Sequence, residues 1–110
     1  MDKELTTRQE VETFVKDNTA ALIYFYSDNC APCISLRPKV VQLLEEEYPK
    51  MQLSFVNSEK YPAVPAAFGI FANPTLVSYF EGDEYRRESK YVSIPQLSQL
   101  IARPYNMIFD

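Results

Sequence analysis

The spacing of apolar residues changes along this chain of 110 residues, and each change predicts a different element. Residues 20–26 (AALIYFY) are a short apolar run rich in β-forming residues, which predicts a strand buried on both faces. Apolar residues recur at helical spacing before this run, in a helix that Thr6–Thr7 can cap and that ends near Asp17. They do so again over residues 34–48, where Pro38 predicts a kink.

The second half of the chain continues the alternation of strands and helices. We expect strands, a short helix and a final helix, in this order: Met51–Asn57, helix 63–71, Thr75–Phe80, Tyr85–Tyr91 and helix Ile94–Ala102. Glu81-Gly82-Asp83 is a hairpin signal, and Pro104 is expected to end the last helix. Phe68, Ile70 and Phe71 are expected to face the core. The order predicts one α/β domain over residues 1–110, with a mixed sheet flanked by helices.

Composition and charge exclude several classes of protein. The net charge of −4 argues against a nucleic-acid-binding protein, which would show a basic face. No apolar run approaches the length of about 20 residues that a membrane helix needs. The polar start of the chain shows no signal segment, so we expect a cytoplasmic protein. The chain has no histidine, which excludes Ser–His and Cys–His catalytic pairs.

The two cysteines, Cys30 and Cys33, stand two residues apart in the stretch FYSDNCAPC. A structural disulfide between them would close only a tiny loop and would constrain the unfolded chain little. A zinc site needs four ligands, and the chain has no histidine and no second cysteine pair. A metal shared between two subunits stays open as a minor alternative. In a reducing compartment, a close cysteine pair indicates redox chemistry.

The predicted order of strand, tight turn and helix places Cys30 at or just before the first turn of a helix. Free backbone N–H groups and the positive end of the helix dipole favour a thiolate there. Thiolate is the attacking species in disulfide exchange. We therefore expect Cys30 to attack a substrate disulfide and Cys33 to resolve the mixed disulfide. Pro32 offers no N–H and should stiffen the turn, while Asp28 is expected to cap the helix.

Four features stand at matching places in the predicted elements: the motif Cys30-Ala31-Pro32-Cys33 after a buried strand, Pro38 in the helix, the segment Asn73-Pro74-Thr75-Leu76 before a strand, and Gly82 in the hairpin. With them, the sequence from Thr6 to Ala102 resembles the thioredoxin family. The resemblance implies a thiol–disulfide oxidoreductase that acts on protein disulfides, needs no bound cofactor and takes electrons from a separate reductase. It further implies a cis Asn73–Pro74 bond facing the cysteines. We expect Asn29, Ala31, Pro32, Asn73 and Pro74 to contact substrate, and the protein to be a monomer.

Four positions depart from the family pattern. Asn29 replaces a tryptophan and Ala31 a glycine, while Tyr24 and Phe55 stand where the family has a buried aspartate and its lysine partner. A tyrosine with a pKa near 10 is a poor proton acceptor at neutral pH, so we expect slower resolution by Cys33. The replaced tryptophan, aspartate and lysine favour an alternative function, a binding or accessory module of this fold with weak or no turnover, whereas the intact cysteine pair and Pro74 oppose it.

Overall fold

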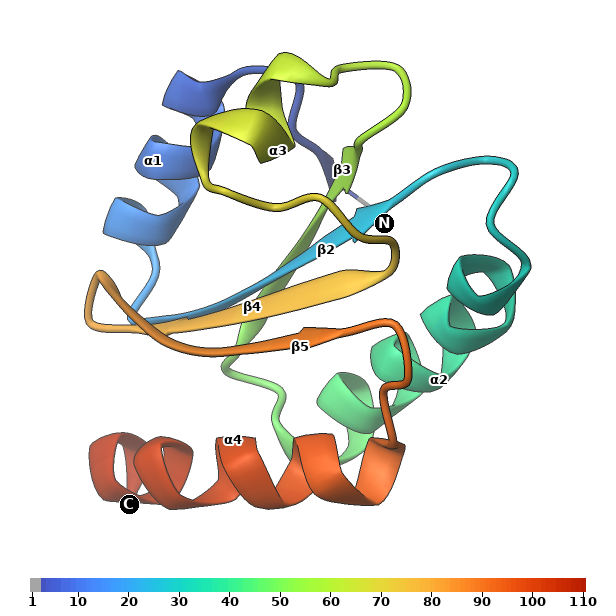
Figure 1. The fold of residues 1–110 in the computed structure, drawn as a ribbon. Coiled ribbons are helices and arrows are strands. Elements are labelled where there is room, and N and C mark those ends of the chain that lie inside the picture. Colours follow the sequence, from blue (N-terminus) through green and yellow to red (C-terminus); the bar gives the residue numbers. More distant parts are fainter. Residues whose placement is uncertain (1–2) are drawn as a thin grey trace.

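A five-stranded sheet organises the fold, and the computed structural model describes it over residues 3–110. The strands lie in the order β1-β3-β2-β4-β5, with helices on both faces (Figure 1). The elements, in chain order, are β1 (Lys3–Glu4), α1 (Arg8–Asp17), β2 (Ala20–Tyr26), α2 (Ala31–Glu47), β3 (Gln52–Asn57), α3 (Ala63–Ala67), β4 (Thr75–Phe80), β5 (Asp83–Ser89) and α4 (Ile94–Phe109). The predicted α/β class and mixed sheet are confirmed.

Strand direction divides the sheet into two parts. β1 and β2 run parallel to β3, whereas β4 pairs antiparallel with both β2 and β5. β2 therefore lies at the centre, paired with β3 on one side and β4 on the other. Six of its seven residues are buried, as the apolar run predicted.

Two cores cover the two faces of the sheet. Side chains of β2 alternate between them, with Leu22 and Tyr24 in one core and Ile23 and Phe25 in the other. α2 and α4 supply the first core, and α1 and α3 supply the second. A central strand with both faces covered has no freedom to slip in register, because a shift of one residue would exchange the two cores.

The last helix extends beyond its predicted end, so the prediction that Pro104 ends it is wrong. α4 continues to Phe109 with Pro104 inside. The Tyr105 ring packs edge-on against Tyr48 at 5.0 Å between ring centroids, and its hydroxyl accepts the backbone N–H of Lys50 at 3.0 Å. This packing offsets the backbone hydrogen bond that a proline inside a helix removes.

Two other predictions fail where a residue adopts the left-handed conformation. α3 ends at Ala67 and Gly69 turns the chain with φ +69°, which leaves Phe71 86% exposed rather than in the core. Ile70 is buried as expected. β5 covers Asp83–Ser89 instead of Tyr85–Tyr91, since Lys90 leaves the extended conformation with φ 64°.

Tyr105 should contribute far more stability than an exposed tyrosine. We expect Tyr105→Ala to lower the free energy of unfolding by about 3 kcal/mol, because it removes a buried ring and leaves a cavity. Tyr91, which is 94% exposed, provides the matched control, and its replacement by Ala should change stability by less than about 0.5 kcal/mol. Urea denaturation measures both. Equal effects would show that the helix beyond Pro104 adds no stability.

Candidate active site

Cys30 occupies the N-cap of α2, directly after the turn that follows β2. Its sulfur accepts a hydrogen bond from the Cys33 N–H at 3.2 Å, and its carbonyl accepts the Ile34 N–H at 3.2 Å. The sulfur thus occupies the place where an N-cap oxygen satisfies a free backbone donor. The prediction that Asp28 caps the helix is wrong, because its carboxylate accepts the side-chain amide of Asn57 instead.

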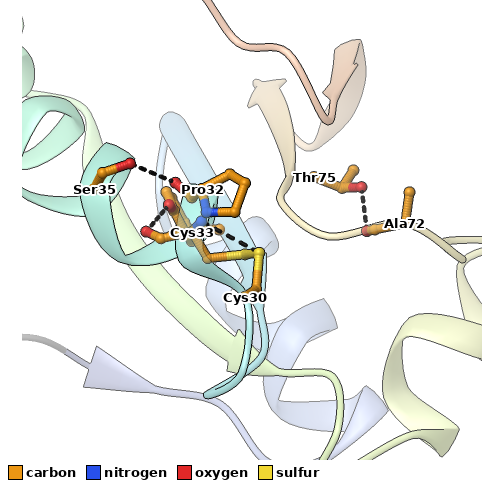
Figure 2. Close-up of a disulfide and its surroundings, with 7 residues drawn as sticks. Cys30, Pro32, Cys33, Ser35, Ala72 and Thr75 are labelled. Atoms are coloured by element: carbon orange, nitrogen blue, oxygen red, sulfur yellow. Dashed lines mark hydrogen bonds between the residues drawn. A yellow bond between two sulfur atoms is a disulfide. The ribbon is translucent and has the colours of Figure 1, made fainter.

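Cys30 and Cys33 form a disulfide, with Cα atoms 5.2 Å apart. Figure 2 shows the bond at the first turn of α2, next to Pro32. Cys33 is only 2% exposed and packs in the core that α2 and α4 share, whereas Cys30 is half-buried. A partner approaching from solvent therefore meets the sulfur of Cys30 first.

The segment before β4 faces this disulfide, as Figure 2 shows for Ala72 and Thr75. The Thr75 hydroxyl donates to the Ala72 carbonyl at 2.7 Å, and the Pro74 carbonyl accepts the Lys90 N–H at 2.8 Å. The Asn73–Pro74 peptide is cis, which confirms the predicted geometry. The structure therefore brings the cysteine pair and the proline segment together from distant parts of the sequence.

The remaining predicted contact residues lie around the cysteines. Ala31 and Pro32 are exposed in the first turn of α2. Asn29 is exposed in the preceding turn, and its amide donates to the Glu59 carboxylate at 3.3 Å. Asn73 is half-buried beside Pro74. All five predicted contact residues thus belong to the two segments that meet at the disulfide.

Tyr24 lies beneath the site and contacts the backbone of the buried cysteine. Its side chain is fully buried, and its hydroxyl donates to the Cys33 carbonyl at 2.5 Å. Burial raises the pKa of Tyr24 to about 12, although the nearby charge of Arg37 opposes the shift. At neutral pH the group is a neutral hydrogen-bond donor and cannot act as a base, which agrees with the expectation from the sequence.

Arg37 lies beside the aromatic residues beneath the site, and the sequence did not identify it. Its guanidinium stacks on the Phe55 ring at 3.7 Å and lies 5.0 Å from the Tyr26 ring centroid. It also pairs with the Glu4 carboxylate at 3.2 Å. Arg37 is one helical turn after Cys33, so its spacing in the sequence could have placed it near the site. A stacked cation thus lies over Phe55, where the family pattern has a lysine.

The Thioredoxin family model matches residues 2–103, which is nearly the whole chain. The chain belongs to the thioredoxin family. A thioredoxin-like protein of Bacillus subtilis, YdfQ, is 27% identical over 88% of this chain and 86% of its own length. A thioredoxin of Rickettsia bellii is 25% identical over 92% and 93% of the two chains. The solved thioredoxin of Fasciola hepatica superposes with a TM-score of 0.83 at 26% identity, covering 92% of this chain and 97% of its own.

Membership of the thioredoxin family agrees with the geometry of the cysteine pair. Family and geometry together support thiol–disulfide oxidoreductase function in general, with disulfides as substrates and a reductase as partner. Within residues 3–110, no helix is long and apolar enough to cross a membrane. Over the same residues, no three side chains of His, Cys, Asp or Glu converge on a common metal position.

The Tyr24 hydroxyl should stabilise the fold without taking part in proton transfer. We expect Tyr24→Phe to lower the free energy of unfolding by about 1–2 kcal/mol, because it removes a buried hydrogen bond. The loss should be constant between pH 6 and 9. Since the folded pKa of Tyr24 is raised to about 12, its stabilisation is complete below pH 10 and declines as the pH rises from about 10 to 12.

Urea denaturation of both proteins across this pH range measures the difference. Tyr61→Phe, at a half-buried tyrosine, is the matched control. A difference that changes between pH 6 and 9 would mean that Tyr24 ionises there, contrary to its burial.

Proposed function

We propose that this protein is a protein disulfide reductase in which Cys30 is the nucleophile and Cys33 the resolving thiol. The observation that carries the proposal is the unequal burial of the two sulfurs at a helix N-terminus. Cys30 is the accessible one and occupies the N-cap, where backbone N–H groups and the helix dipole stabilise a thiolate. Cys33 is buried but within bonding distance.

The reaction follows from this arrangement in two exchange steps. The Cys30 thiolate attacks one sulfur of a substrate disulfide, and the bond between the substrate sulfurs breaks. The first substrate thiolate leaves and is protonated. The Cys33 thiolate then attacks the Cys30 sulfur, which releases the second substrate thiol. Two electrons have passed to the substrate, and the protein holds the Cys30–Cys33 disulfide until a separate dithiol reductase restores it.

The proton of Cys33 needs an acceptor other than Tyr24. With a pKa near 12, the Tyr24 phenol stays protonated at neutral pH. We infer that the first substrate thiolate or solvent takes the Cys33 proton, which makes resolution the slower exchange step. Arg37 lies near enough to Tyr24 for its charge to oppose the rise of the Tyr24 pKa, and its guanidinium pairs with Glu4.

The proposal extends to the surroundings of the reaction. Asn29, Ala31, Pro32, Asn73 and Pro74 are proposed to contact the substrate, with the Asn73 backbone pairing with an extended strand. We further propose that the protein acts as a monomer in the cytoplasm, where thiols are kept reduced. It would use no bound cofactor, because the cysteine pair carries both electrons.

A binding or accessory module is the second candidate function. Tyr24 and Phe55, in place of an acid and a lysine, favour this alternative because they remove the usual base for the second thiol. Such a module would bind partners over the same surface without repeated turnover. The two candidates differ in whether a mixed disulfide forms and is then resolved.

Selective labelling tests the order of attack. Iodoacetamide should modify Cys30 of the reduced protein much faster than Cys33, because Cys30 is accessible and lies at the helix N-terminus. Cys33→Ser should accumulate a mixed disulfide on Cys30 with an oxidised substrate, whereas Cys30→Ser should form none. Peptide mass spectrometry measures both results. Equal labelling of the two thiols would overturn the assignment.

A second substitution tests the missing base. Tyr24→Asp should speed the decay of the mixed disulfide by about tenfold or more, because a carboxylate can take the Cys33 proton. It should also destabilise the protein, since it buries a charge. Tyr24→Asn is the matched control, because asparagine has nearly the size of aspartate but carries no carboxylate. If the folded Asp and Asn variants resolve the intermediate at the same rate, proton removal does not limit resolution.

A further inference from the structure

A pocket of about 380 Å³ adjoins the disulfide and carries only positive charge among its lining residues. It lies between one face of α2 and the connection from β5 to α4, which run beside each other in Figure 1. Pro32, Ser35 and Lys39 form the α2 wall, and Lys90 and Tyr91 lie in the opposite wall. Pro32 stands between the two cysteines in the sequence, so the pocket shares one residue with the cysteine motif.

The two lysines contrast with the charge of the whole chain, which is −4. Glu88 is the carboxylate closest to Lys90 in sequence, and it does not line the pocket. Asp28 and Glu59 belong to the other flank, because they follow β2 and β3 whereas Lys90 follows β5 at the far edge of the sheet. Lys60 partly offsets the charge of that acidic flank. The two sides of the disulfide therefore differ in charge.

The backbone holds Lys90 next to the proline segment that faces the disulfide. Lys90 adopts φ 64°, a conformation that side chains make unfavourable and that glycine adopts freely. Its N–H donates to the Pro74 carbonyl at 2.8 Å, which fixes the residue next to the segment that faces the cysteines. Uncommon backbone conformations of this kind cluster at binding sites.

We propose that Lys39 and Lys90 select oxidised polypeptides that carry acidic residues near the reactive cysteine. This inference rests on the proposed reductase function and names its substrate class. Lys39 lies about 13 Å along α2 from Cys30, the residue that bonds the substrate, at about 1.5 Å per residue, and side chains of a helix tilt back toward its N-terminus. An extended substrate advances about 3.3 Å per residue, so a carboxylate two to four positions from its cysteine reaches the lysines. The exposed ring of Tyr91 supplies apolar contact between them.

Peptides of identical length test the preference. Each contains one cysteine activated as a neutral 2-thiopyridyl disulfide, with Glu, Gln or Lys two and three positions away, on either the N-terminal or the C-terminal side. Stopped-flow release of thiopyridone by the reduced protein gives the second-order rate constant. The Glu residues precede the cysteine in one peptide and follow it in another. One of these two Glu peptides should react about three- to tenfold faster than the Gln peptide with the same arrangement, since exposed ion pairs contribute modestly. High salt should remove the difference.

Variants assign the effect to the two lysines. Lys39→Gln combined with Lys90→Gly, which preserves the left-handed turn, should bring the ratio of Glu to Gln rates close to one. Lys39→Glu combined with Lys90→Glu should make the Lys peptide the preferred one. Lys16→Gln, which removes one charge from the exposed face of α1, is the matched control and should leave the ratio unchanged.

The outcomes separate this inference from the function on which it rests. Equal rates for Glu and Gln peptides, or a preference that persists in the double variants, would overturn the charge selection and leave the reductase function intact. No reaction with any peptide would overturn both.

Discussion

Burial of β2 on both of its faces is the constraint on which the site depends. β2 pairs with β3 and β4, and its side chains alternate between two cores. Its register is therefore fixed by two neighbouring strands and by burial on both faces. The strand therefore ends at a fixed point, and the short turn after it starts α2 at Ala31. Cys30 thereby reaches the N-cap position, where its sulfur meets free N–H groups. The reactivity proposed for Cys30 follows from this strand more than from any side chain around it.

A pair of aromatic rings, accompanied by one ion pair, lies beneath the cysteines. Tyr24 donates its hydroxyl to the Cys33 carbonyl, and the Tyr24 and Phe55 rings contact each other at 5.6 Å between centroids. Arg37 closes this cluster from α2 by stacking on Phe55, and Glu4 of β1 pairs with it. The cluster packs Arg37 of α2 against Phe55 of β3, and Glu4 pairs with its charge. Neither Tyr24, with its raised pKa, nor Phe55 can take the proton of Cys33 at neutral pH.

Local patterns predicted the parts of the fold that depend on local sequence. The apolar run 20–26 and the segment Thr75–Phe80 are strands with the predicted bounds. Both strands are buried on both faces, so most of their consecutive residues are apolar and the pattern is visible in the sequence. The prediction that Pro104 ends the last helix failed because packing from distant elements can offset the cost of a proline inside a helix. Here Tyr48 and the backbone of Lys50 contact Tyr105. β1 is two residues long and pairs through its backbone with β3, so no side-chain pattern marks it.

The cysteine motif and the proline segment were also predictable, since both carry distinctive residues. Arg37 was not identified because the direction of a long side chain depends on which rings lie below it. The charged pocket likewise needed the structure, since it joins α2 to a turn some 50 residues later in the chain, at Lys39 and Lys90.

Reduction of insulin disulfides by dithiothreitol, followed by turbidity, tests the central claim most directly. Catalytic amounts of the protein should accelerate the reaction, and Cys30→Ser should abolish the acceleration because the accessible nucleophile is lost. A folded protein that gives no acceleration at any concentration, or an acceleration that survives in Cys30→Ser, would contradict catalysis by this cysteine pair.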